Sequence, residues 1–288
     1  MSTLLSFVGL SSQEVAVALQ IAANCVAVLA LTLALHFMSW GIARHTYTSL
    51  AFSNKVFWVL SLVEIAVACG ATAAGLHVAL GIPYIAQNPV WGWTDKVNPA
   101  IYAVCGLHVV QIALRVWFRN ALLRDGTAFA SGSTLFAESI FGLIALPSAA
   151  IFRVGCWFVA VGLVMYGAVP LFTLRRLMRM SGMGGGGRLY CAVRVALIPT
   201  FVAFRAVPAA ALALNLGIRC NDVAGVNNSA LLGFFVLGGG TLLVANAWWG
   251  FALVRCAVRR VRGARGAASA ARRGGANAPA VQHARLVD

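Results

Sequence analysis

Seven long apolar segments, joined by short polar connections, constrain the fold of this chain more than any other feature. They are Val15–Trp40, Phe57–Ile82, Pro99–Phe118, Thr134–Phe152, Val154–Leu174, Leu189–Gly217 and Ala230–Arg255. About 20 apolar residues of helix cross the hydrocarbon core of a bilayer. A backbone in hydrocarbon must also form its hydrogen bonds within its own segment, which favours helices over open strands. The sequence therefore predicts an all-α protein, a seven-helix transmembrane bundle.

The composition supports a membrane protein over a soluble one. Of 288 residues, 61% are hydrophobic and only 10% are charged, whereas a soluble domain carries about 25% charged residues. The apolar segments use up nearly the whole length, so we expect one bundle over residues 15–255 after a short lumenal N-terminus of residues 1–14. Residues 256–288 are rich in Ala, Gly and Arg, a composition that predicts a basic, disordered cytosolic tail.

Positive charge is concentrated on alternate connections between the segments. The first, third and fifth connections and the tail hold most of it, in Arg44, Lys55, Arg119, Arg124, Arg175, Arg176, Arg179, Arg188, Arg259 and Arg260. The other connections carry few charges, with acids and bases nearly balanced. An excess of Lys and Arg marks the cytoplasmic side of a membrane protein. We therefore predict an N-terminus that is lumenal or outside the cell and a C-terminus in the cytosol.

The net charge of +15 is compatible with nucleic-acid binding, but its distribution favours another partner. The basic residues lie at segment ends and in the tail, where they would meet anionic lipid headgroups. We expect membrane lipids as partners, with anionic headgroups at the Arg-rich cytosolic face, and no nucleic acid. The chain has no Cys/His cluster with metal-ligand spacing, and its glycine run at 184–187 lacks the Lys of a phosphate-binding loop. We expect no metal and no cofactor.

Ionisable residues inside the apolar segments are costly and are the first candidates for a site. Arg205 lies near the middle of the sixth segment, and Glu64 and Glu138 are the acids available to pair with it. A structural ion pair is the more common explanation of such residues than a substrate site. Pro199 and Pro208 flank Arg205 and predict an irregular, kinked helix there. His108 could line a polar cavity or bond a neighbouring carbonyl.

Several short motifs occur in the order seen in one membrane-protein family. Trp58 is followed by Ser61 and Glu64, Glu138 by Ser139, and Asn246 by Trp249, while the stretch 201–205 is aromatic-rich and ends in Arg205. Over residues 55–260 the chain resembles a degenerate member of the TLC-domain family, which includes ceramide synthases and translocating-chain-associated membrane proteins. The resemblance implies a helical bundle with a polar or lipid-binding cavity. Its candidate residues are Glu64, His108, Glu138, Arg205, Asn246 and Trp249.

The chain differs from this family at the residues that carry out the family's catalysis. Catalytic members carry an adjacent His pair, and this sequence has none; Glu64 stands where a histidine is usual. General acid–base chemistry needs a titratable group within reach of the reacting atom. The resemblance therefore implies a non-catalytic protein that binds lipid or influences membrane lipid composition, with no catalytic residues. It also implies a location in the endoplasmic reticulum or another endomembrane.

Two other functional classes remain open at this stage. A seven-transmembrane receptor would share the expected topology, although a retinal protein is excluded because Lys55 and Lys96, the only lysines, lie in connections rather than in the last span. An accessory subunit of a larger membrane complex is the second alternative.

Overall fold

The computed structural model describes residues 11–118, 133–183, 187–224, 239–240, 242–244, 246–251 and 254–255, and every regular element in these ranges is helical. The first half contains α2 (Ser12–Ile42), α3 (Arg44–Ser49), α4 (Phe52–Gly81), α5 (Pro83–Gln87), the 3₁₀ turn η1 (Asp95–Val97) and α6 (Asn98–Trp117). Ser11 caps α2 through a reciprocal pair of hydrogen bonds with Glu14, which fixes the start of that helix.

The second half is built from helices that join end to end. They are α8 (Ser133–Phe152), α9 (Cys156–Val164), η3 (Met165–Ala168), α10 (Val169–Met180), α11 (Arg188–Phe201), η4 (Val202–Ala206), α12 (Val207–Ile218) and α13 (Cys220–Ala224). The run α9–η3–α10 forms one span, and the run α11–η4–α12 forms another.

Five helical runs in the described residues are long and apolar enough to cross a membrane. They are Ser12–Ile42, Phe52–Gly81, Asp95–Trp117, Cys156–Met180 and Arg188–Ile218. Two shorter apolar helices, Gly142–Phe152 and Leu242–Phe251, fall within the fourth and seventh segments expected from the sequence. The chain is therefore an integral, multi-pass helical membrane protein.

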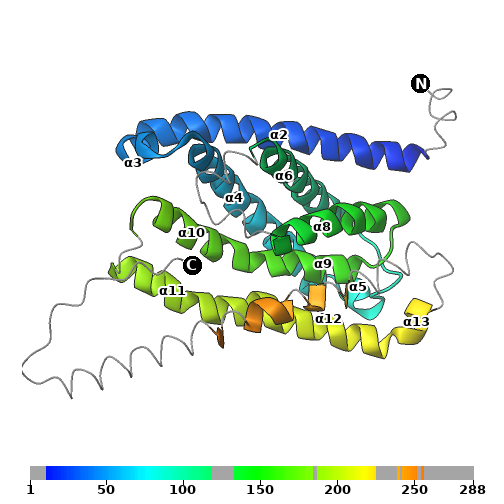
Figure 1. Ribbon diagram of the computed structural model, residues 1–288. Coiled ribbons are helices and arrows are strands. Elements are labelled where there is room, and N and C mark those ends of the chain that lie inside the picture. Colours follow the sequence, from blue (N-terminus) through cyan, green and yellow to red (C-terminus); the bar gives the residue numbers. More distant parts are fainter. Residues whose placement is uncertain are drawn as a thin grey trace, which may run out of the picture.

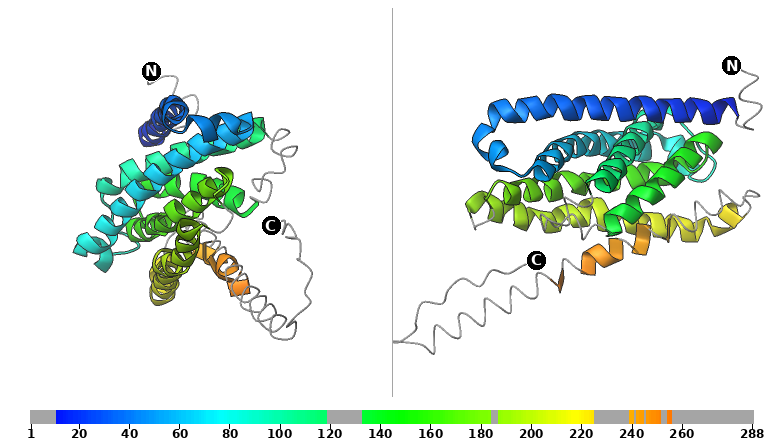
Figure 2. Two further views of the ribbon diagram at one scale, coloured as in Figure 1. Left: turned by 90° about the vertical axis from the view of Figure 1, so that its left-hand side faces the viewer. Right: turned by 45° about the horizontal axis from the view of Figure 1, so that its top comes forward.

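The spans lie side by side in one bundle (Figures 1 and 2), and α6 and the α9–α10 span run in the same direction because α8 lies between them in the chain. α2 is the outermost: only 11% of its apolar window is buried in the protein, against 33–50% for the other spans. α4 and α6 lie between α2 and the α9–α10 span, and α11–α12 lies on the side of the bundle away from α2. The bundle interior is therefore bounded by α4, α6, α8, α9–α10 and α12.

Two glycines allow the closest helix crossings. A Cβ atom on Gly75 of α4 would lie 2.5 Å from the carbonyl oxygen of Ala160 in α9, and one on Gly106 of α6 would lie 2.9 Å from Asn24 in α2. Small residues at such crossings let two backbones approach within van der Waals contact, which holds helices together in lipid.

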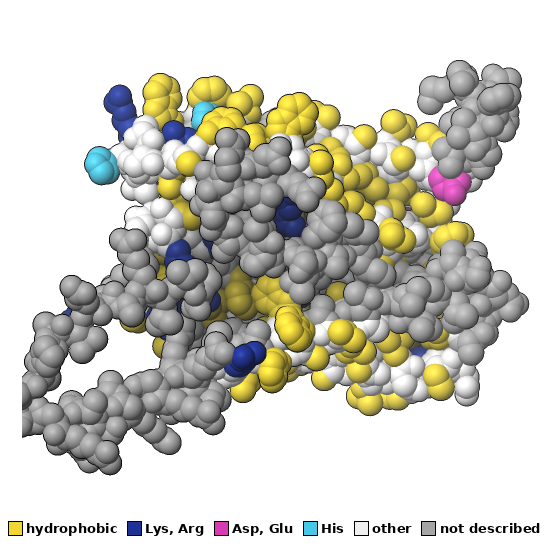
Figure 3. Space-filling view, viewed as in Figure 1, with side chains coloured by type: hydrophobic (Ala, Val, Ile, Leu, Met, Phe, Trp, Pro, Cys, Tyr) yellow, Lys and Arg dark blue, Asp and Glu magenta, His cyan; other side chains and the backbone are white. Residues whose placement is uncertain are grey.

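The two ends of the bundle differ in charge. At the end where α5, η1 and α13 lie, Arg153 forms an ion pair with Asp95 at 2.8 Å, and Arg219 lies 3.5 Å from Asp222. At the opposite end, the helix termini carry arginines and a lysine, and no acid lies among them in the described residues. Most basic side chains visible in Figure 3 lie toward that end. One end is thus internally neutralised and the other is strongly basic.

The structure corrects the expected end of the fifth span. The sequence placed it at Leu174 and assigned Arg175, Arg176 and Arg179 to a connection, but α10 continues to Met180. The helix continues because Thr173, Leu177 and Met178 are buried on one side, so this arginine-rich turn is amphipathic rather than a loop.

The irregularity predicted around Arg205 takes the form of a π-helical turn. Val202–Ala206 is π-helical, and Pro199 and Pro208 lie on either side of it. Each proline lacks a backbone donor, so the normal hydrogen-bond pattern is interrupted on both sides. Single π turns of this kind occur mostly within α-helices and often at functional sites.

Candidate functional site

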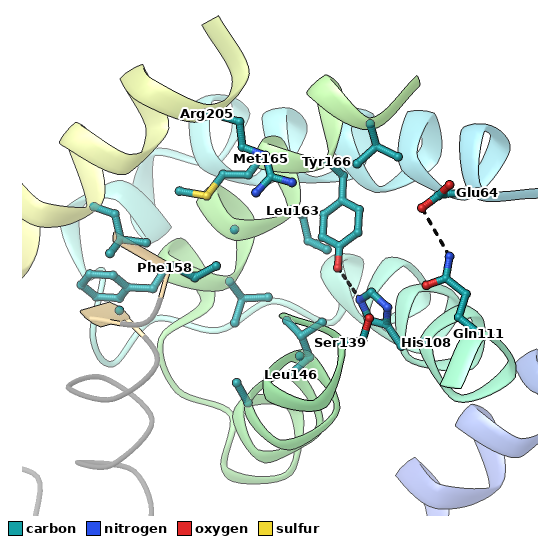
Figure 4. A pocket seen from close by; sticks show the side chains of 18 of the residues that line it. Glu64, His108, Gln111, Ser139, Leu146, Phe158, Leu163, Met165, Tyr166 and Arg205 are labelled. Carbon is teal, nitrogen blue, oxygen red and sulfur yellow. Dashed lines mark hydrogen bonds between the residues drawn. The ribbon is translucent and has the colours of Figure 1, made fainter. Parts of the chain in front are cut away.

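A cavity of about 120 Å³ lies in the bundle interior and is lined from α4, α6, α8, α9–η3–α10, η4–α12 and the residues Gly239 and Leu242. Figure 4 shows its lining. Glu64 and Gln111 lie toward one side, Phe158 lies toward the other, and Tyr166, Met165 and Arg205 lie between them. The cavity is therefore amphipathic: polar at one end and apolar at the other.

The polar wall comes largely from one face of α6. His108, Gln111 and Arg115 all line the cavity, and their spacing of three and four residues stacks them on one face of the helix. Arg115 is in the last turn of α6, close to the basic end of the bundle. The polar end of the cavity thus points toward the basic end of the protein.

Glu64 of α4 is the centre of a hydrogen-bond network across three helices. Its Oε2 accepts from Arg176 Nη2 at 2.6 Å and from Thr173 Oγ1 at 3.0 Å, and its Oε1 accepts from Gln111 Nε2 at 3.3 Å. Arg176 also donates to Ser61 Oγ at 2.9 Å. Charge-assisted hydrogen bonds of this kind are roughly twice as strong as neutral ones, so the network fixes α4, α6 and α10 relative to one another.

His108 pairs with a tyrosine inside the cavity. Its Nε2 lies 2.6 Å from the hydroxyl oxygen of Tyr166 in η3. The His108 side chain is buried, and its Nδ1 has no hydrogen-bond partner among the described residues. Gly142 of α8 provides the space for the ring, since a Cβ there would lie 3.4 Å from His108 Cδ2. Among the described residues, the ring bonds this hydroxyl group and not the neighbouring carbonyl that was the expected alternative.

Arg205 projects from the π-helical turn and is buried despite its charge. Its Nη1 donates to Asn246 Oδ1 at 3.4 Å, and its guanidinium lies 5.7 Å from the centroid of the Trp249 ring. The amide of Asn246 also donates to the carbonyl of Leu242 in its own helix at 2.7 Å. A cation above an indole face is attracted by the ring quadrupole, so this cluster stabilises a charge that would otherwise be costly at this depth.

The structure therefore brings five of the six expected residues to one region. Glu64, His108 and Arg205 line the cavity, and Asn246 and Trp249 contact Arg205. The sixth, Glu138, belongs to α8, but its side chain lies outside the described residues.

The expected pairing of Arg205 with Glu64 is wrong. Glu64 forms its ion pair with Arg176, because α10 extends far enough to bring this arginine beside α4. The other expected partner of Arg205, Glu138, has its side chain outside the described part of the chain.

The sequence candidates did not include several residues of the site, among them Thr173, Arg176 and Tyr166. A signal for two of them was present, because Thr173 and Arg176 are spaced three apart, as are Ser61 and Glu64. Pairs with this spacing share a helix face. Because Arg176 was assigned to a connection, the sequence did not show that the Thr173–Arg176 face could contact the Ser61–Glu64 face.

Comparisons with known proteins identify no relative of this chain: no protein-family model, no curated protein and no solved structure matches it. The site must therefore be interpreted from its own chemistry. Within the described residues, no three His, Cys, Asp or Glu side chains gather as metal ligands would.

Proposed function

We propose that this protein binds a lipid in its interior cavity and does not catalyse acyl transfer. The observation that carries the proposal is the amphipathic lining, which combines apolar side chains such as Phe158, Leu163 and Leu216 with the polar side chains of Glu64, Gln111 and Arg115. Ligand sites are commonly apolar cavities with a few convergent polar groups. A lipid presents the same division between chain and headgroup.

The charge distribution supports the full topology that we propose, with seven spans, an outside or lumenal N-terminus and a cytosolic C-terminus. The arginine-rich end of the described bundle would face the cytosol and meet anionic headgroups there. The opposite end, with its Arg153–Asp95 and Arg219–Asp222 pairs, suits the lumenal side. We further propose a location in the endoplasmic reticulum or another endomembrane.

The positions of the motif residues support the TLC-like fold that we propose. Ser61 and Glu64 join the network on α4, Ser139 lines the cavity from α8, and Asn246 contacts Arg205. Motifs far apart in the sequence thus gather around one cavity, as they would if they formed a shared site.

The geometry of Glu64 favours binding over catalysis. A general base must be available to take a proton from the attacking group, but both oxygens of this carboxylate already accept hydrogen bonds, one of them from Arg176. The absence of an adjacent His pair in the sequence also favours binding over catalysis. Purified protein incubated with acyl-CoA and a sphingoid base should give no acylated product by mass spectrometry. Product that disappears in Glu64→Gln or His108→Ala would overturn this part of the proposal.

Lipid binding is tested by filling the cavity. Gly162 of α9 lines it, and no heavy atom lies within 4 Å of the position of a Cβ there. Gly162→Leu should occupy the cavity and reduce the lipid that co-purifies with the protein, measured by mass spectrometry of the extract. Gly70→Leu is the matched control, because Gly70 is exposed on α4 and a Cβ there also meets nothing within 4 Å.

The two variants separate a specific ligand from lipid on the outer surface. A lipid species lost in Gly162→Leu and kept in Gly70→Leu supports the cavity as its site. Equal lipid content and composition in both variants and the parent protein would contradict the proposal.

One observation favours a second candidate function, that of an accessory subunit. α2 exposes large apolar side chains along its length, among them Leu19, Val26, Leu33 and Phe37. Lipid or a partner helix could cover this face. Cross-linking from α2 in native membranes, followed by mass spectrometry, distinguishes a stable protein partner from lipid alone.

A further inference from the structure

Arg175 of α10 differs from its neighbour Arg176, which pairs with Glu64. The Arg175 guanidinium has no hydrogen-bond or ion-pair partner among the described residues, and its Nε is buried. A guanidinium group carries N–H donors and no acceptor, so it is satisfied by an acceptor or an anion. The half-buried Arg175 side chain therefore offers donors and a positive charge that the described bundle leaves unused.

The position of Arg175 on α10 places it toward the next helix. α10 and α11 follow one another in the chain and lie side by side in opposite directions (Figure 1). Met178 of α10 forms a buried cluster with Tyr190 and Val193 of α11, and Leu171 packs against this cluster. Arg175 comes four residues after Leu171 and three before Met178, a spacing that puts all three on one face. Arg175 therefore lies on the side of α10 that faces α11.

A second arginine lies at the same level on α11. Arg194 comes four residues after Tyr190, and its guanidinium lies 5.6 Å from the centroid of that ring. Because the two helices run in opposite directions, residues just before Met178 lie opposite residues just after Tyr190. Arg175 and Arg194 are therefore at one level, and neither α10 nor α11 contains Asp or Glu. Two like charges repel each other, and an anion between them removes that repulsion.

The depth of the two arginines favours a lipid over a soluble anion. Both belong to helical runs that are long and apolar enough to cross a membrane, Cys156–Met180 and Arg188–Ile218. Each lies five or six residues from the basic end of its run, which is about 8 to 9 Å of helix. Long basic side chains near a span end extend to the level of the lipid headgroups. One turn deeper than Arg194, on the same face of α11, Ile198 is exposed and can contact an acyl chain.

We propose that Arg175 and Arg194 form a site for one phospholipid with a terminal phosphate group, in the leaflet at the arginine-rich end. Guanidinium groups bind phosphate oxygens through paired, charge-assisted hydrogen bonds. A phosphate monoester carries a charge of about −1.5 to −2 at pH 7, which matches two arginines. This inference rests on the proposed contact of the arginine-rich end with anionic headgroups, and it names the lipid class and the residues that hold it.

Binding of defined probes to the purified full-length protein, measured by native mass spectrometry, tests the inference. The probes are phosphatidate, phosphatidylserine and phosphatidylcholine with identical short acyl chains, and glycerol 3-phosphate, which is the phosphatidate headgroup without chains. One phosphatidate should bind with a dissociation constant at least about tenfold lower than that of phosphatidylcholine, since charge-assisted hydrogen bonds contribute more than neutral ones. Phosphatidylserine should fall between the two. Glycerol 3-phosphate should bind at least about tenfold more weakly than phosphatidate, because it buries no apolar chain.

Matched variants locate the phosphate. Arg175→Gln and Arg194→Gln should each weaken phosphatidate binding by about tenfold or more and leave phosphatidylcholine binding nearly unchanged. Arg44→Gln is the control, because Arg44 is exposed on α3 at the same end of the bundle, and it should change binding by less than about twofold. Arg175→Lys keeps the charge but not the paired geometry, so it should lose less affinity than Arg175→Gln. Arg194→Gln tests the same site from the second helix if Arg175→Gln does not fold.

The outcomes separate this site from the headgroup contact on which it rests. Phosphatidylserine binding as tightly as phosphatidate would overturn the terminal phosphate, and glycerol 3-phosphate binding as tightly would overturn a lipid as the ligand. Equal losses in Arg44→Gln and the two site variants would overturn a discrete site and leave a general preference for anionic headgroups intact. No preference for either anionic lipid over phosphatidylcholine would overturn the headgroup contact as well.

The interior cavity is tested separately by Gly162→Leu, the variant that fills it. Phosphatidate binding should be unchanged in Gly162→Leu, because Arg175 and Arg194 do not line the cavity. Loss of phosphatidate binding in this variant would place the lipid in the interior and overturn the site between α10 and α11.

Discussion

At the scale of single residues, side chains from neighbouring helices compensate the charges inside the bundle. Glu64 accepts hydrogen bonds from three different side chains on two helices, and Arg205 contacts an amide and an indole ring. Inside a membrane, a charge without such contacts costs at least roughly 2.5 to 3.5 kcal/mol on insertion scales. These contacts therefore decide where the helices can sit relative to one another.

The Glu64–Arg176 pair gives a residue-scale prediction. Arg176→Ala should lower the free energy of unfolding by about 1 to 3 kcal/mol, because it leaves a largely buried carboxylate without its cation. The double variant Glu64→Gln, Arg176→Met should recover much of that loss, since replacing both partners removes the unpaired charge. Thermal unfolding in detergent measures both changes.

Arg179→Ala is the control for this pair, because Arg179 is exposed on the same helix and its loss should change stability by less than about 0.5 kcal/mol. If Arg176→Ala proves no more damaging than Arg179→Ala, the pair does not hold the helices together.

The sequence predicted which polar residues gather but only some of their contacts. Depth along a span can be counted from its ends, and this placed Glu64, His108 and Arg205 in the interior. Pairing depends on how helices are rotated and on where they end. Glu64 was expected as a possible partner of Arg205 because Arg176 was placed in a connection. The Tyr166 contact requires η3 and α6 to face each other, which no local pattern indicates.

At the scale of elements, the boundaries and irregularities of the helices position the site. The extension of α10 to Met180 brings Arg176 to Glu64, and the π-helical turn at Val202–Ala206 orients Arg205. Proline spacing predicted the second feature, because Pro199 and Pro208 interrupt the hydrogen-bond pattern on both sides. The extension of α10 was not predicted, because the length of the apolar run ends the span at the first arginines. One face of the helix nevertheless stays buried beyond that point.

The α4–α9 crossing gives a prediction at this scale. Gly75→Ala should destabilise the protein by about 1 to 3 kcal/mol, because its Cβ would lie 2.5 Å from a backbone oxygen and the helices would have to separate. Gly70→Ala, on the same helix with no atom within 4 Å of the new Cβ, should cause no loss. Unfolding temperatures of the two variants provide the comparison, and equal values would show that α4 and α9 do not pack as described.

At the scale of the whole molecule, charge and hydropathy agree on a membrane bundle with two unlike ends. Of the seven apolar segments expected from the sequence, five correspond to helices in the described residues that are long and apolar enough to cross a membrane. The fourth and seventh apolar segments are represented only by shorter described helices, so the count of seven stays a prediction. The cavity itself had no signature in the sequence, because its walls come from helices far apart in the chain that meet only in the folded protein.

The proposed orientation gives a prediction at this scale. Epitope tags at the two termini, probed after selective permeabilisation of the plasma membrane, should show an accessible C-terminus and a protected N-terminus, because arginine-rich ends stay on the cytoplasmic side. A protected C-terminal tag with an accessible N-terminal tag would reverse the orientation and remove the reason to place the polar end of the cavity near the cytosol.

Lipid in the interior cavity is tested most directly by an experimental density map of the purified protein in a lipid nanodisc. We expect elongated density in the cavity, with one end near Arg115 and Gln111 and the rest running past Tyr166 toward Phe158. The same map of Gly162→Leu should lack it. A cavity that is empty or closed by side chains in the unmodified protein, while lipid is ordered around the outer surface, would contradict the lipid-binding account.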